Sequence, residues 1–129
     1  MLKIAIDIDG TIDATTRSIE FFDLLTHCLE EKAKIYILTN RDPGIHSTNE
    51  TKQELARLGI RFDYLIIKED KASFILNEGI DIFFENQDEY FKELPDTVMV
   101  FKAREVMNFD FLAKKWSYSN KTGINIDKE

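Results

Sequence analysis

The sequence predicts an α/β protein, a Rossmann-like three-layer sandwich with a mainly parallel β-sheet between two layers of helices. Two observations predict this fold class. Short apolar runs that suit buried strands recur along the chain, and helical stretches separate them. Parallel strands need such long crossover connections. Right-handed crossovers then place helices on both faces of the sheet. With 129 residues, 43% of them hydrophobic, we expect one domain over residues 1–129.

Five apolar runs predict the strands of the sheet. The first run is apolar except for Lys3 up to two acidic residues, and the others end at polar residues that break the pattern. The expected strands are residues 2–8, 34–38, 64–67, 80–84 and 98–101.

Apolar residues at helical spacing, together with capping residues, predict the helices between these strands. The expected helices run from Thr15 or Thr16 to about residue 32, from Ser47 or Thr48 to Gly59, over 70–77 and over 87–94. Near the C-terminus, 116–119 and 124–127 flank the turn-like run 120–123, which predicts a β-hairpin. This hairpin is expected to extend the sheet, cover its edge or pack beside a functional site.

Composition narrows the class of protein. The net charge of −7 disfavours broad electrostatic binding to nucleic acid. The sequence has no apolar run long enough for a membrane helix, and Lys3 and Asp7 interrupt the N-terminal apolar stretch. The single cysteine, Cys28, has no internal disulfide partner. We therefore expect a cytoplasmic protein that does not contact membranes.

Polar side chains follow the first four predicted strands. Ligands bind outside the carboxyl ends of parallel strands, so these side chains are expected to meet at one edge of the sheet. The residues are Asp7, Asp9 and Thr11 after the first strand, Thr39, Asn40 and Arg41 after the second, Lys68 and Lys71 after the third, and Glu85, Asn86 and Asp88 after the fourth.

Asp7 and Asp9 are the most informative pair among these residues. Side chains alternate along a strand, so the two carboxylates would share one face until the chain turns at Gly10. Such a pair can bind Mg²⁺ and can divide nucleophilic and acid–base roles. The alternative is a strand followed by an ordinary Asp-Gly turn with solvated acids.

The run Asp7-Ile8-Asp9-Gly10-Thr11 resembles the first signature motif of the haloacid dehalogenase (HAD) superfamily. Thr39 after an apolar strand, a lysine before the fourth strand and Glu85 after it match the other three motifs in order. The resemblance covers residues 2–101 and is greatest to small nucleotidase-like phosphatases. It implies a Mg²⁺-dependent phosphatase that hydrolyses a phosphomonoester, nucleotide-related or bulky, through an aspartyl-phosphate intermediate.

The resemblance also implies roles for single residues. Asp7 would be the nucleophile, and Asp9 would protonate the leaving oxygen and later deprotonate water. Thr39 would donate a hydrogen bond to the transferring phosphoryl group. Gly10 and Thr11 would offer backbone N–H groups to the same group.

A lysine would neutralise the nucleophile and the phosphate oxygens. Lys71, fourteen positions before Glu85, fits this role better than Lys68. Asn40 and Arg41 are expected to contact substrate, although Arg41 could equally be a surface residue at the entry to a helix.

Mg²⁺ would be held by Asp7, by the backbone carbonyl of Asp9 and by Glu85. The fourth motif departs from the family here, because Asn86 stands where a second acid is usual. Asp88 could replace the missing charge, or it could cap a helix. Weaker Mg²⁺ binding is the expected consequence.

The chain leaves no room for the cap domain that closes the site in many HAD enzymes. An open site suits a bulky phosphomonoester or a nucleic-acid or other macromolecular phosphate end, or it needs a lid from a second subunit of a homo-oligomer. Two other functions compete with a phosphatase. One is a non-catalytic HAD-like phosphate-binding or partner-binding protein. The other is a receiver-type phosphoacceptor, which residues 66–68 disfavour because they hold no aspartate at the end of the third strand.

Overall fold

The computed structural model describes the chain except for residues 117, 120–124 and 127–129. A five-stranded sheet forms its centre, in the order β3-β2-β1-β4-β5, and every neighbouring pair of strands is parallel. The strands are β1 (Leu2–Ile6), β2 (Ala33–Thr39), β3 (Tyr64–Ile67), β4 (Ile82–Glu85) and β5 (Met99–Lys102). The predicted Rossmann-like α/β class is therefore confirmed.

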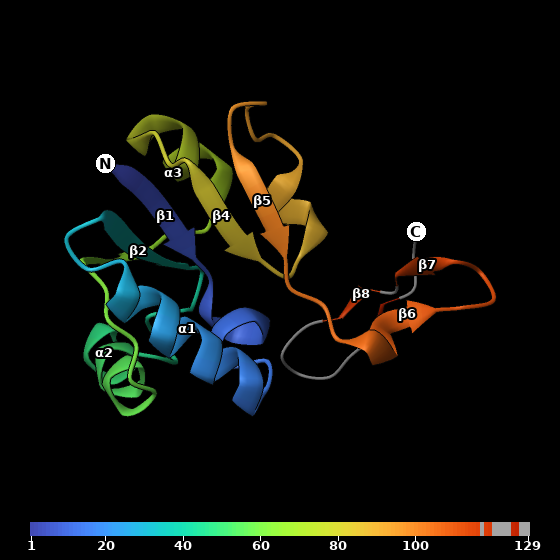
Figure 1. The fold of residues 1–129 in the computed structure, drawn as a ribbon, viewed down its shortest axis with the longest axis horizontal. Helices are drawn as coiled ribbons and strands as arrows, with labels where there is room; N and C mark the ends of the chain where they lie inside the picture. The colour runs from blue at the N-terminus through green and yellow to red at the C-terminus, as the bar shows by residue number, and fades with distance from the viewer. Residues whose placement is uncertain (117, 120–124, 127–129) are drawn as a thin grey trace.

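Helices cover both faces of this sheet (Figure 1). The helices α1 (Thr16–Cys28) and α2 (Thr48–Arg57) pack on one face, over a core that includes Ile6, Ile37 and Leu55. The helix α3 (Lys71–Glu78) and the 3₁₀ turn η2 (Asp88–Phe91) pack on the other face, over a core that includes Leu38, Ile75 and Phe83. Burial of these apolar side chains supplies the main driving force for the three-layer arrangement.

Capping residues set where the first two helices begin. Thr15 caps α1, and its side chain and that of Ser18 each accept a hydrogen bond from the other residue's backbone N–H. Ser47 caps α2 by accepting from the N–H of Glu50. Gly59 follows α2 with a φ of +77°, a conformation that side chains other than glycine's rarely adopt.

Three predicted elements are shorter than expected. The helix α1 ends at Cys28 rather than at about residue 32. The first strand ends at Ile6 rather than at residue 8, because the chain turns into η1 (Ile8–Ile12), a turn that Gly10 permits with a φ of +83°. The predicted helix over 87–94 is only the turn η2. The side chain of Gln87 makes no capping hydrogen bond, and the backbone N–H of Gln87 donates to the Glu85 carboxylate.

The C-terminal part forms two small antiparallel ladders outside the main sheet. After the turn η3 (Val106–Asn108), β6 (Phe109–Asp110) pairs with β7 (Lys115–Trp116). Then β8 (Tyr118–Ser119) pairs with β9 (Asn125–Ile126), as the predicted hairpin requires, whereas its turn at 120–123 lies outside the described residues. Figure 1 shows β6 and β7 to one side of the sheet, past the end of β5.

None of the helices in the described part of the chain combines the length and the apolar character that a membrane crossing needs.

Candidate active site

The candidate site lies where the strand order reverses, between β1 and β4. The chain runs outward from β1 to β2 and β3 on one side, and β4 and β5 lie on the other. Open α/β sheets bind ligands at such a switch point, outside the carboxyl ends of the strands. Asp7 follows β1 and donates its backbone N–H to Phe84 in β4, and Glu85 ends β4 beside it.

Lys71 joins these two acids. Its Nζ lies 2.8 Å from Oδ1 of Asp7 and 2.6 Å from Oε1 of Glu85. All three side chains are almost wholly buried, and that of Lys71 is 1% exposed. A buried ammonium is stable only with such partners. Lys68 is exposed, so the structure brings Lys71, and not Lys68, to the site.

The charges in this cluster do not balance. Burial lowers the pKa of Lys71, but the charges of Asp7 and Glu85 outweigh it and the pKa is raised. Burial and the charge of Glu85 raise the pKa of Asp7 to about 8, and Lys71 offsets them only in part. When both carboxyl groups are ionised, two carboxylates and one ammonium carry a net negative charge, which either a proton on Asp7 or an additional cation would neutralise.

Asn86 fills the space between the acids. In the orientation that its surroundings require, its side-chain nitrogen faces Oε2 of Glu85 at 2.8 Å, Oδ2 of Asp7 at 3.1 Å and the carbonyl oxygen of Asp9 at 3.1 Å. Gly10 makes room for this carboxamide, because a Cβ at Gly10 would stand 2.9 Å from Cγ of Asn86. The requirement for glycine at position 10 is therefore steric as well as conformational.

The donor set fits a divalent cation such as Mg²⁺. The oxygens of Asp7, Glu85 and the Asp9 carbonyl, which the family resemblance implies as ligands, all lie within 3.1 Å of the amide nitrogen of Asn86. Among the described residues, no group of three or more His, Cys, Asp or Glu side chains is placed to hold a metal ion. Asp88 lies elsewhere, paired with Lys102 at 2.7 Å and with Arg104 at 3.2 Å.

Two threonines line the same edge. Oγ1 of Thr11 donates to Oδ2 of Asp7 at 3.2 Å and helps to fix the rotamer of that carboxylate. Thr39 is fully buried at the end of β2, where its Oγ1 accepts the backbone N–H of Arg41 at 3.2 Å. A hydroxyl that accepts one hydrogen bond still has its own proton to donate to another acceptor.

Asp9 points to a second cation, Arg41. The guanidinium donates to both oxygens of Asp9, at 2.9 and 2.8 Å, and to both oxygens of Glu54, at 3.1 and 3.0 Å. The side chain of Arg41 is 5% exposed, so it is no surface residue, and these two carboxylates take up its fork. The hydrogen bond to Asp9, assisted by Glu54 and opposed by burial, raises the pKa of Arg41.

The sequence did not indicate a role for Glu54. It is one of several charged residues on α2, and no motif distinguishes it from the others.

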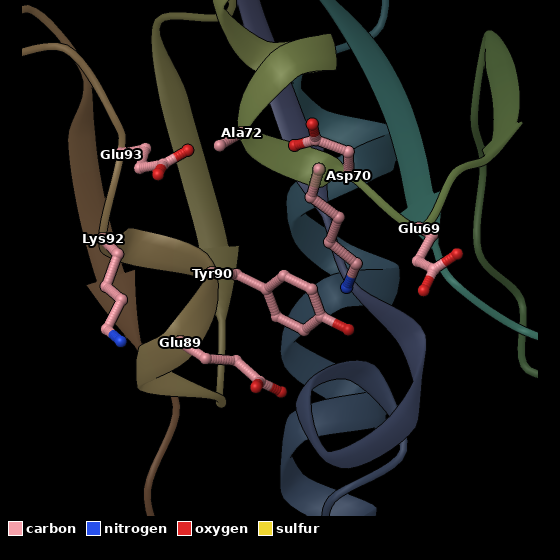
Figure 2. A pocket seen from close by; sticks show the side chains of 8 residues that line it. Glu69, Asp70, Ala72, Glu89, Tyr90, Lys92 and Glu93 are labelled. Atoms are coloured by element: carbon pink, nitrogen blue, oxygen red, sulfur yellow. The ribbon is translucent and has the colours of Figure 1, made fainter.

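Tyr90 was also missed. The centroid of its ring lies 4.3 Å from Nζ of Lys71, a cation–π contact. Its hydroxyl oxygen accepts a hydrogen bond from the side-chain amide of Asn40. The ring forms one wall of a pocket of about 180 Å³ beside α3 (Figure 2). Two lysines, Lys71 and Lys92, and four acidic residues also line this pocket, so it is acidic on balance; the acidic residues are Glu69, Asp70, Glu89 and Glu93. The sequence predicted a helix over 87–94 and did not indicate that Tyr90 would lie near Lys71.

Comparison with known proteins supports the fold. No protein-family profile and no curated protein matches the chain. A chain in the structure of the Pnkp1/Rnl/Hen1 complex is 16% identical, with a TM-score of 0.60 over 79% of this chain and 46% of its own length. A chain in the structure of the Pnkp1/Rnl/Hen1 RNA repair complex is 17% identical, with a TM-score of 0.58 over 79% and 42%. Our chain thus spans less than half of either, and at this identity the likeness shows the fold alone.

Replacement of Lys71 tests the buried cluster. Lys71→Met would leave two buried carboxylates without a countercharge, so we expect it to lower the free energy of unfolding by about 3–5 kcal/mol at neutral pH. The matched control Lys68→Met, at an exposed position, is expected to change it by less than about 0.5 kcal/mol. Urea titration measures both variants. Equal effects of the two substitutions would contradict the assignment of Lys71.

The pKa of Asp7 predicts how stability depends on pH in metal-free protein. Because that pKa rises from 3.8 to about 8, the folded state keeps a proton that the unfolded state releases. The contribution of Asp7 to stability therefore falls as pH rises from about 4 to about 8. Urea titrations in chelator across this range should show the fall, and Asp7→Asn should remove it. A variant with the same slope as the parent would refute the prediction.

Proposed function

We propose that the chain is a Mg²⁺-dependent phosphatase of the HAD superfamily, acting on a phosphomonoester through an aspartyl-phosphate. The observation that carries this proposal is the placement of Asp7. Its carboxylate lies at a strand end in a switch-point site, 2.8 Å from a buried lysine. A nucleophile that attacks an anionic phosphoryl group needs such cationic surroundings.

In the first step, Asp7 attacks phosphorus. A new P–O bond forms to the carboxylate, and the bond to the leaving oxygen breaks with its electron pair on that oxygen. Lys71 neutralises charge on Asp7 and on the phosphoryl oxygens. Thr39 donates a hydrogen bond from its hydroxyl to the phosphoryl group, and the backbone N–H of Thr11 supplies a further donor. The backbone N–H of Gly10, expected to do the same, donates to Oδ1 of Asp13 at 2.9 Å instead.

Asp9 is the proton carrier in the proposed reaction. It gives a proton to the leaving oxygen and then accepts one from the water that hydrolyses the aspartyl-phosphate, which releases orthophosphate and restores Asp7. To do so, the carboxyl group must leave at least one of its hydrogen bonds to Arg41. Glu54 keeps its own two bonds to Arg41, so this movement does not leave a buried guanidinium without a counterion.

Mg²⁺ held near Asp7, the carbonyl of Asp9 and Glu85 would neutralise the phosphoryl charge and the excess negative charge of the cluster. Lys71 donates to Oε1 of Glu85, whereas Oε2 accepts the backbone N–H groups of Asn86 and Gln87 and would still have to reach the metal.

The substrate class follows from the surroundings of the site. The similar solved chains come from an RNA repair complex, so a phosphate end of RNA belongs in any substrate screen. The acidic pocket beside Tyr90 and the net charge of −7 oppose a polyanion on that side, and favour a small phosphomonoester. We place this activity in the cytoplasm, where the exposed thiol of Cys28 stays reduced.

Hydrolysis of a generic aryl phosphate tests the proposal. We expect turnover that requires Mg²⁺ and is lost in Asp7→Asn, because the amide cannot act as the nucleophile. Thr48→Ala, a change in the first turn of α2 outside the site, serves as a control and should keep the activity. Activity that persists in Asp7→Asn, or is absent from the parent across aryl phosphates, nucleotides and RNA 3′-phosphates, would favour a non-catalytic phosphate-binding protein instead.

A further inference from the structure

We propose that the side-chain amide of Asn86 is a built-in occupant of the cation position, which Mg²⁺ must displace before the site can work. This inference rests on the proposed function for its significance. Its geometry and its test, however, concern cation binding alone.

The first support is the set of contacts that the amide makes. Its nitrogen faces Oδ2 of Asp7, Oε2 of Glu85 and the carbonyl of Asp9, at distances of 2.8 to 3.1 Å. These are the oxygens expected to bind the metal. An NH₂ group carries two donors and a partial positive charge, so it satisfies in part the acceptors that a cation would otherwise satisfy.

The second support is the way the chain holds the amide there. The side chain of Asn86 is wedged against Gly10, where no Cβ could be accommodated, and Asn86 is 3% exposed. Arg104 donates to its backbone carbonyl, and Glu85 accepts its backbone N–H at 2.9 Å. The residue is thus fixed on both sides of its Cα, and the carboxamide can leave only by turning about its own side-chain bonds.

The consequence is a competition between the amide and the metal. Hydrated Mg²⁺ gives up water reluctantly and binds carboxylates more tightly as their number rises. Here it must also break the hydrogen bonds of the amide, whose loss is costly in a buried site. We therefore expect weak Mg²⁺ binding by the parent protein, so that the occupied state depends on cation concentration.

Calorimetric titration with Mg²⁺ alone, without substrate, tests this proposal. Asn86→Ala removes the occupant, and we expect it to bind Mg²⁺ about fivefold or more tightly than the parent. If Asn86 were instead only a ligand, the same change would weaken binding. Asn86→Ser, too short to fill the position, gives a second variant with the same expected gain should Asn86→Ala fail to fold. Asn77→Ala, at an exposed position on α3, is the matched control and should bind like the parent.

Thermal unfolding supplies an independent readout. In chelator, Asn86→Ala should unfold at a lower temperature than the parent, because the buried oxygens around the amide lose its two N–H donors. Added Mg²⁺ should raise its unfolding temperature by more than it raises that of the parent. Weaker or equal Mg²⁺ binding by both Asn86 variants, or no binding by any variant, would overturn the proposal. Loss of phosphatase activity would not, since neither measurement depends on turnover.

Discussion

The buried ammonium of Lys71 is the interaction on which the rest of the site depends. It lies between Asp7, the residue after β1, and Glu85, the last residue of the neighbouring strand β4, and all three side chains are withdrawn from water. Two carboxylates so close together would repel each other without it. By holding them in place, Lys71 ties α3 to the carboxyl edge of the sheet and presents Asp7 in a fixed orientation.

A second cation separates the two aspartates that the sequence places side by side. Arg41 holds the carboxylate of Asp9, while Lys71 holds that of Asp7. The turn at Gly10 allows this divergence, since the strand ends before it and the chain no longer alternates. Two acids that lie one residue apart thus come into different electrostatic surroundings, which is the physical basis for assigning them different roles.

Much of the fold could be predicted because its causes are local. Apolar runs located all five strands, and the run at 64–67 matched β3 at both ends. The spacing of Lys71 from Glu85 also pointed to the lysine that the structure places beside Asp7 and Glu85, since a lysine at the start of α3 reaches the end of β4. A parallel sheet brings the ends of its strands together regardless of the loops between them, so the location of the site followed from the order of the elements.

What could not be predicted depends on contacts between distant segments. Glu54, on α2, forms an ion pair with Arg41, which follows β2. No feature of the local sequence distinguishes Glu54 from its charged neighbours. Tyr90 lies on η2, which is a short turn rather than the expected helix, and its ring contacts Lys71, nineteen positions earlier in the sequence. The sequence showed that Asn86 breaks the acidic pattern, but only the structure shows its amide among the oxygens expected to bind the cation.

The central claim is that Asp7 becomes covalently phosphorylated. The most direct test is a single turnover with Mg²⁺ and a phosphomonoester that the screen identifies, stopped in acid and followed by peptide mass spectrometry. The account predicts one phosphoryl group on the N-terminal peptide, attached to Asp7 and absent without Mg²⁺. Turnover with no phosphorylated peptide, or with the phosphoryl group on another residue, would contradict it.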